Sequence, residues 1–308
     1  MLSGLVIVDK PQGWTSHDVV GRMRRLAGTR KVGHAGTLDP MATGVLVVGI
    51  NKATRLLTYI VGTGKSYQAT IRLGATTVTD DAEGEVTATA ATGMVTDAAI
   101  AAGIAALRGP IMQVPSSVSA IKVNGERAYA RVRSGEDVKL AARPVTIHGF
   151  DVAQIRRVDG FIDLDVTVEC SSGTYIRALA RDLGAGLNVG GHLTALRRSA
   201  VGPYTLAQAS TLEELASEMR ILDIADAARA LMPVRELSAH EAVELSFGRR
   251  IPASAEGTHT AEAPAAAFAP DGTLVALLFD AGRHARPVLV FPADAPPASG
   301  TPGRDVAP

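Results

Sequence analysis

Short apolar runs, and segments in which apolar and polar residues alternate, predict strands, because successive side chains of a strand point to opposite faces of a sheet. These patterns predict strands at residues 5–8, 45–50, 65–73, 145–155 and 161–170. The last two segments are expected to pair. In the last one, apolar side chains recur at every second position and should share one buried face.

Apolar residues that recur every three to four positions predict helices instead. Ser16 can cap a helix that ends near Gly28. Arg22 and Arg25 fall off the apolar face of that helix and are expected at the surface. Further helices are predicted at residues 53–60, from the cap Thr96 to residue 107, at 173–183, and after a capping box of Ser210 and Glu213.

The order of these elements indicates a chain of two parts. Strands and helices do not alternate as regular strand–helix–strand units, which disfavours a doubly wound parallel sheet. We place a boundary near residue 232, because short apolar runs at 273–279 and 287–291 predict a small β domain beyond it. Residues 293–308 are rich in Pro, Ala and Gly and are expected to form a disordered tail.

Composition and charge narrow the classes of protein. The 308 residues include 31 basic and 31 acidic side chains, so net charge does not indicate a polyanionic partner. The single cysteine, Cys170, excludes an intrachain disulfide and a multi-cysteine zinc site, and favours a reducing compartment. No apolar run reaches about 18 residues, and the first residues do not resemble a signal peptide. A cytoplasmic location without membrane contact is expected.

Basic and acidic residues are unevenly distributed along the chain, although their totals are equal. Residues 19–38 contain no acid, and residues 122–143 form a second basic stretch. Arginine suits bidentate contacts with phosphate, although codon bias is the favoured explanation for the excess of Arg over Lys. The local clustering of these residues predicts a basic face. The first stretch carries Arg22, Arg24, Arg25, Arg30 and Lys31.

The segment from residue 33 to 44 is the most unusual in the chain. It combines glycines, His34 and an Asp-Pro pair just before a predicted strand, which indicates a tight loop that approaches another group closely. Asp39 is an isolated acid in a basic stretch, where nearby cations favour its charged form. From spacing alone, however, an aspartate that caps a turn before Pro40 is the favoured interpretation. The loop matches neither common nucleotide-binding glycine motif, and no metal or serine-hydrolase motif occurs elsewhere.

This loop, GHAGTLDPMATG, resembles the catalytic loop of the TruB family of tRNA pseudouridine synthases, G-H-x-G-x-L-D-P-x-A-x-G, at every fixed position. The resemblance extends in the correct order over residues 4–202. It includes the LVIVDKPQG opening at 5–13, the KSY motif at 65–67, LGATTVTDDAEG at 73–84, CSSGTYIR at 170–177 and LRR at 196–198.

The resemblance implies an α+β pseudouridine-synthase fold, with a mixed, mostly antiparallel sheet flanked by helices. It also implies a catalytic domain over residues 1–231 with an RNA-contacting insertion at about 118–145. A small PUA-like RNA-binding β domain would follow at 232–292. The implied reaction isomerises uridine 55 in the T-loop of tRNA to pseudouridine without a cofactor or metal.

Three residues would carry the chemistry by resemblance. Asp39 would be the essential carboxylate, acting either as a nucleophile toward the sugar or the ring, or as a base that removes the 2′ proton. Arg177 would pair with Asp39, and Tyr67 would stack on the target base and assist removal of the C5 proton. Without the resemblance, Arg177 would be interpreted as a surface charge and Tyr67 as a core side chain.

Other residues would contact or shape the RNA site. His34 would pack against the T-loop once the target base is flipped out, which the chemistry requires because the stacked base is shielded. Lys10 would shape the site, and Tyr175 lies in a matched motif. Charge alone suggests phosphate contacts at Arg22, Arg24, Arg25, Arg30, Lys31, Lys122, Arg131, Arg197 and Arg198.

Two other functions remain open at this stage. The chain could be a tRNA-binding or tRNA-folding module in which catalysis is secondary. Alternatively, it could be a glycosidase-like enzyme that uses Asp39 on a free nucleoside. The tRNA T-stem-loop is the expected partner, and a monomer is expected.

Overall fold

The computed structural model describes residues 3–116, 122–123, 126–127, 140–254 and 259–292. The chain divides into two compact units, one of residues Leu5–Ile221 and one of Met1–Gly4 with Leu222–Pro308. The division precedes the boundary predicted near residue 232. Most of the predicted insertion at 118–145, and all of the predicted tail at 293–308, lie outside the described residues.

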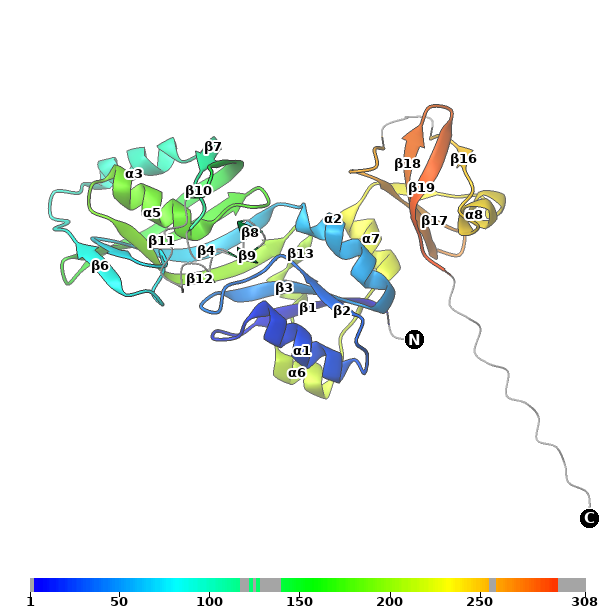
Figure 1. Cartoon of the computed structure of the whole chain (residues 1–308), viewed down its shortest axis with the longest axis horizontal. Coiled ribbons are helices and arrows are strands. Elements are labelled where there is room, and N and C mark those ends of the chain that lie inside the picture. Colours follow the sequence, from blue (N-terminus) through cyan, green and yellow to red (C-terminus); the bar gives the residue numbers. More distant parts are fainter. Residues whose placement is uncertain (1–2, 117–121, 124–125, 128–139, 255–258, 293–308) are drawn as a thin grey trace, which may run out of the picture. The chain divides into compact units, whose positions relative to one another are not determined.

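A mixed sheet organises the large unit (Figure 1). Its strands follow the order β1 (Gly4–Lys10), β3 (Thr43–Ile50), β12 (Gly191–Val201), β4 (Lys65–Leu73), β11 (Phe161–Cys170), β10 (Arg143–Val158) and β7 (Gly109–Gln113). β2 (Val32–Ala35) pairs with β3, and β13 (Tyr204–Thr205) pairs with β12. β12 runs parallel to β3 and antiparallel to β4, which in turn is antiparallel to β11. The expectation of a mixed, mostly antiparallel sheet is confirmed.

The buried face of this sheet carries the core. Ile162, Leu164, Val166 and Val168 of β11 are each at most 2% exposed, which confirms the alternation predicted for that strand. Helix α5 (Ile176–Gly186) packs against β12 and against α3 (Asp97–Ala106), as Figure 1 also shows. α3 is capped by Thr96, as predicted. Because α5 covers this face, side chains at its N-terminus can reach the end of the sheet where the Asp39 loop lies.

Two helix starts differ by one residue from the prediction. Thr15, not Ser16, caps α1 (Ser16–Leu26), since its side chain accepts from the Asp18 backbone N–H and the Asp18 carboxylate accepts from the Thr15 N–H. Likewise Thr211 and Glu214, not Ser210 and Glu213, form the capping box of α6 (Leu212–Ser217). In both cases the adjacent serine is buried and cannot serve as a surface cap.

The remaining elements of the large unit are short. The segment predicted as one helix at 53–60 is a 3-10 turn, η1 (Asn51–Leu56), followed by α2 (Leu57–Val61). The helix predicted at 173–183 begins later, at Ile176, because Gly173 has a φ of +85° and Tyr175 is extended. The other elements are β5 (Ala75–Thr77), β6 (Val86–Thr89), β8 (Lys122–Val123), β9 (Glu126–Arg127) and η2 (Leu206–Gln208).

The small unit has a sheet and a core of its own. Its sheet follows the order β15 (Val234–Glu236), β17 (Ala265–Phe268), β18 (Leu274–Ala281), β19 (His284–Val290) and β16 (Ile251–Pro252). The small unit also contains α7 (Ile224–Leu231), α8 (Ala239–Ser246) and β14 (Leu222–Asp223), which is not a strand of this sheet. The small C-terminal β domain is confirmed. Among the described residues of both units, no helix is long and apolar enough to cross a membrane.

Candidate active site

Hydrogen bonds on both sides of Asp39 fix the loop between β2 and β3. Before it, the buried Ser16 hydroxyl accepts from the Leu38 N–H at 2.9 Å and contacts the Leu38 carbonyl oxygen at 3.1 Å. After it, the Gly13 N–H donates to the Pro40 carbonyl at 2.8 Å. The Ala42 N–H donates to the Asp39 carbonyl at 3.1 Å, which closes a turn. These hydrogen bonds hold the main chain at Asp39 in place.

Lys10 lies beneath this loop with no exposed surface. Its Nζ donates to the carbonyls of Pro11 at 2.9 Å, Trp14 at 2.6 Å and Pro40 at 3.3 Å. Burial lowers the pKa of Lys10 to about 8, and the negative charge of Asp39 opposes that shift. These three hydrogen bonds tie the end of β1 to the main chain of the loop.

Arg177, from the first turn of α5, reaches the Asp39 carboxylate at 3.0 Å. Its side chain is only 5% exposed, whereas that of Asp39 is 39% exposed. On the buried side, Arg177 meets Asp81 at 3.3 Å and donates to the Thr79 carbonyl at 2.8 Å. Asp81 and Thr79 thus hold the Arg177 guanidinium on its buried side. Its other side contacts the Asp39 carboxylate, which is exposed enough for a substrate to reach.

Asp81 is a site residue that sequence reasoning missed. Its carboxylate is 3% exposed and accepts from the Thr79 hydroxyl at 2.5 Å and the Glu83 N–H at 3.1 Å. It lies in the matched stretch at 73–84, but nothing in its local pattern indicates that it faces Arg177. That contact depends on how α5 packs over the loop after β5.

Tyr67 faces the same region from the central strand β4. In the sheet it is paired with Val168 on one side and with Arg198 on the other, and it is 9% exposed. Burial is the main cause that raises the pKa of Tyr67; the charge of Arg198 opposes the shift and that of Asp39 adds to it. The phenol is therefore neutral at physiological pH, with Asp39 close enough to act on it.

Arg198 is not a surface contact for phosphate, and that expectation is wrong. The residue is 1% exposed. Its Nε donates to the Val45 carbonyl at 2.7 Å, and its Nη atoms donate to Gly36 at 2.9 Å and Thr37 at 3.4 Å. Strand alternation explains the difference, because Arg197 points to the opposite face of β12 from Arg198.

His34 lies on β2, directly before the loop, whereas Tyr175 lies directly before α5. The His34 ring on β2 lies 5.8 Å from the ring of His17 in an edge-to-face arrangement. Burial, with the charges of His17 and Arg198, lowers the pKa of His34. Tyr175 precedes α5, where its backbone N–H donates to the Gln113 side chain at 2.9 Å and its carbonyl accepts from it at 3.1 Å.

The predicted phosphate contacts fall into three groups. Arg24, Arg25, Arg30 and Lys31 are exposed and Arg22 is half-buried. Arg197 forms a bidentate pair with Asp9 at 2.6 and 3.0 Å, so an RNA phosphate would have to compete with that carboxylate. The side chain of Lys122, and the whole of Arg131, lie outside the described residues.

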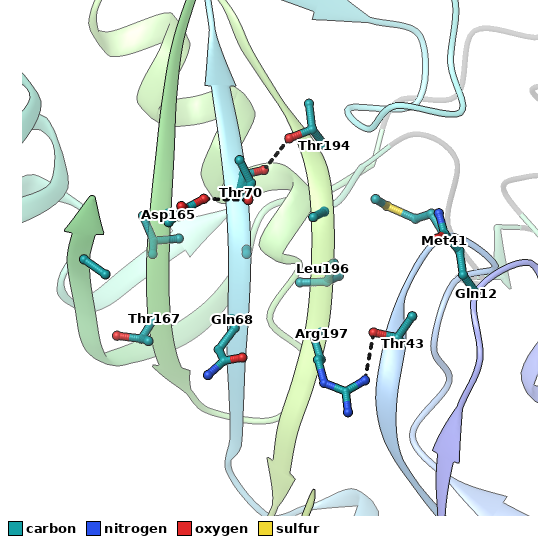
Figure 2. A pocket seen from close by; sticks show the side chains of 14 residues that line it. Gln12, Met41, Thr43, Gln68, Thr70, Asp165, Thr167, Thr194, Leu196 and Arg197 are labelled. Atoms are coloured by element: carbon teal, nitrogen blue, oxygen red, sulfur yellow. Dashed lines mark hydrogen bonds between the residues drawn. The ribbon is translucent and has the colours of Figure 1, made fainter. Parts of the chain in front are cut away.

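An open pocket of 520 Å³ lies over strands β4, β11 and β12 (Figure 2). Gln68 lines it, and strand alternation points the side chain of Tyr67 to the other face of β4. The pocket is lined by polar side chains such as Gln68, Thr70, Asp165 and Arg197, while Met41 and Thr43 from the end of the loop between β2 and β3 form one wall. Its charged groups are already paired within the protein, Asp165 with Arg156 and Arg197 with Asp9. Asp39, Tyr67 and Arg177 do not line it.

Comparison with known proteins gives this geometry its context. Residues 24–176 match the profile of the "TruB family pseudouridylate synthase (N terminal domain)". A tRNA pseudouridine synthase B of Paenarthrobacter aurescens (strain TC1) is 75% identical over 297 residues, which cover 94% of this chain and 96% of that protein. The chain belongs to the TruB family. It is therefore a pseudouridine synthase, an isomerase.

Other comparisons agree with TruB membership. Residues 177–237 match "tRNA pseudouridylate synthase B C-terminal domain", and 232–292 match "tRNA Pseudouridine synthase II, C terminal". The tRNA pseudouridine synthase B of Thermobifida fusca (strain YX) is 59% identical over 94% of this chain and 99% of that protein. A crystal structure of a Cbf5-Nop10-Gar1 complex contains a chain with the same fold, at a TM-score of 0.72 and 24% identity, over 94% of this chain and 85% of that one.

Proposed function

We propose that this TruB-family enzyme converts uridine 55 in the T-loop of tRNA (tRNA numbering) to pseudouridine. The relatives at 75% and 59% identity are named tRNA pseudouridine synthase B, which supports tRNA as the substrate. The observation that carries the assignment of the site is the Asp39–Arg177 pair, in which an accessible carboxylate is held by a buried guanidinium.

Asp39 is the catalytic carboxylate in this proposal. In the overall reaction the bond from C1′ to N1 breaks, a bond from C1′ to C5 forms, and the C5 proton leaves to solvent while N1 gains a proton. Arg177 orients the Asp39 carboxylate through a charge-assisted contact at 3.0 Å. The carboxylate can then act as a nucleophile toward the sugar or ring, or remove the 2′ proton; both routes need it charged.

Tyr67 provides the face on which the flipped uracil stacks. Its ring sits at a fixed place in the central strand, so the stacked base would be held beside the Asp39 carboxylate. The neutral phenol that follows from its raised pKa suits stacking. For Tyr67 to accept the C5 proton, the phenol must first lose its own proton, and the nearby positive charge of Arg198 favours that loss.

RNA binding is proposed to involve the surface around this site. His34 and Tyr175 would contact the remodelled T-loop, and Arg22, Arg25, Arg30 and Lys31 would contact phosphates.

We propose catalytic and RNA-binding domains at residues 1–231 and 232–292, respectively; the matched C-terminal profile supports the second. Ultraviolet crosslinking of tRNA to peptides from 232–292 tests that assignment.

A cytoplasmic monomer is the proposed working form. The lone, buried Cys170 and the tRNA substrate support a reducing compartment. Light scattering of the free protein and of its tRNA complex tests the monomer, which a mass of two chains would contradict.

The decisive experiment uses a T-loop minihelix that carries tritium at C5 of each uridine in turn. Wild-type protein should release label only from the position that corresponds to uridine 55. Asp39→Asn should release none while it still binds the minihelix and melts at the wild-type temperature. Asp151→Asn is the matched control, because that carboxylate is 70% exposed and pairs with Arg108 at the surface.

Three further measurements separate the alternatives: turnover of free nucleosides, the salt dependence of affinity, and rescue of misfolded tRNA. A glycosidase-like enzyme would turn over uridine or UMP, with an affinity that does not depend on salt. A tRNA-folding role predicts that Asp39→Asn rescues misfolded tRNA as well as wild type does, and equal rescue would add this role to the catalytic one. Pseudouridine formation by pure Asp39→Asn would refute the role proposed for Asp39.

A further inference from the structure

Arg198 is a buried cation to which the proposed chemistry assigns only an effect of its charge on Tyr67. Its guanidinium donates to carbonyls on both sides of Asp39, since Gly36 and Thr37 precede the aspartate and Val45 follows it. Burying a cation is costly unless its hydrogen bonds are satisfied. The buried guanidinium of Arg198 therefore bridges the two ends of the loop that carries Asp39.

The backbone of Arg198 is built into the base of the same loop. β12 meets β3 at two residue pairs, Arg197 with Thr43 and Arg198 with Gly44. Gly44 has a φ of +96°, and a Cβ on it would lie 2.2 Å from the Arg198 carbonyl oxygen. A side chain at position 44 would push the strands apart. Main chain and side chain of Arg198 thus contact the loop at separate points.

Arg198 also lies next to Tyr67 in the sheet. It is the cross-strand partner of Tyr67 in the β12–β4 pair, and its charge acts on the phenol. Lys65, two residues before Tyr67, lies close enough to feel the same charge. One side chain therefore touches the loop that carries Asp39 and faces the strand position that carries Tyr67.

We propose that Arg198 is a positioning residue that sets the Asp39 carboxylate relative to the phenol of Tyr67, and so controls the chemical step rather than tRNA binding. This inference rests on the function proposed above for Asp39 and Tyr67. A displacement of about 1 Å in a reacting group can lower a rate about 10²-fold. A purely structural role would instead lower stability without a selective effect on the chemical rate.

The test compares Arg198→Lys and Arg198→Met with wild type in single-turnover tritium release, tRNA binding and thermal melting. Lysine keeps the charge but cannot bridge three carbonyls with a planar fork. We expect both variants to lose roughly 10²-fold in single-turnover rate, with the dissociation constant for tRNA within about threefold of wild type. Arg72→Met is the matched control: Arg72 lies on β4, pairs with Asp163 and is 36% exposed, so its rate should stay near wild type.

Two further variants keep the proposal testable if Arg198→Met does not fold. Arg198→Ala leaves space for a guanidinium ion, and millimolar guanidinium should raise its rate severalfold while equal concentrations of ammonium should not. Gly36→Ala keeps Arg198 but strains the loop, since Gly36 has a φ of +80° and its Cβ would meet Nη1 of Arg198 at 3.4 Å. Gly36→Ala should therefore lose rate and keep tRNA affinity.

The outcomes distinguish this inference from the function on which it rests. A wild-type rate in Arg198→Lys and in Arg198→Ala, with Asp39→Asn inactive, would overturn the role of Arg198 alone. Loss of tRNA binding in parallel with rate would also overturn it. An active Asp39→Asn variant would instead remove the proposed function itself.

Discussion

Arg177 and Asp39 form an ion pair of unequal burial, with a guanidinium that is 5% exposed and a carboxylate that is 39% exposed, 3.0 Å apart. The inequality has a structural cause, because Arg177 is also held by the buried Asp81. Because Asp81 holds Arg177 on its buried side, Arg177 can orient the exposed carboxylate of Asp39 without covering the face that a substrate must approach. This arrangement distinguishes the pair from a surface ion pair, whose partners are both mobile and solvated.

Removal of Arg177 should affect stability and activity through different carboxylates. Arg177→Met leaves Asp81 buried without its cation, which typically costs about 3–5 kcal/mol. In the double variant Arg177→Met/Asp81→Asn, the stranded charge is gone, so part of that stability should return. Activity should not return, because Asp39 still lacks its partner. Urea unfolding and tritium release on the same samples measure the two effects.

Equal stability of the single and double variants would contradict this account. It would mean that the carboxylate of Asp81 is not stranded when Arg177 is removed. Asp81→Asn alone serves as the control that completes the double-mutant cycle.

Tyr67→Phe should separate stacking from proton transfer. Phenylalanine keeps the ring, so affinity for the minihelix should be retained, while loss of proton transfer should cost on the order of 10²–10⁴ in rate. If the phenolate is the base, the wild-type rate should rise with pH below the raised pKa of Tyr67, and Tyr67→Phe should abolish that slope. A Tyr67→Phe rate close to wild type would leave stacking as the only role of this side chain.

Lys10 should make stability depend on pH in a defined window. Its pKa is lowered from 10.5 to about 8 in the folded protein, so the unfolded chain binds more protons between these values. Stability must therefore rise with pH from about 8 toward 10, by on the order of 3 kcal/mol for a shift of this size. Melting curves across this range should show the rise, and Lys10→Met should reduce it. The Lys65→Met background removes the parallel contribution of the other buried lysine, whose pKa is also about 8.

The extent to which sequence predicted this structure depends on the range of the interactions involved. The strand at residues 65–73 was predicted with the bounds it has, because alternation is a local property of the chain. The neighbours Arg197 and Arg198 show the limit. Arg197 pairs with Asp9 at the surface, whereas Arg198 is buried against the loop that carries Asp39. The pairing of β12 with β3 and β4 determines which of the two arginines is buried.

The buried contacts of Ser16 and Asp81 also depend on residues far away in the sequence. Ser16 was predicted as a helix cap from its local pattern, yet its hydroxyl bonds Leu38, twenty-two positions along the chain. Asp81 meets Arg177 only because α5 packs over the loop that follows β5. A local pattern cannot indicate such contacts. For Arg177 it favours a surface charge, and only the resemblance to the family motif indicates a site residue.

Salt dependence of binding should show which exposed cations contact the RNA. If tRNA phosphates are neutralised, the logarithm of affinity should fall with the logarithm of salt concentration, by roughly 0.7–0.9 per phosphate contact. Arg25→Gln, Arg30→Gln and Lys31→Gln should each reduce the slope by about one contact and leave the single-turnover rate at saturating tRNA near wild type. Arg72→Gln is the control, since Arg72 is already paired with Asp163. An unchanged slope in all three variants would place the RNA backbone on a different surface.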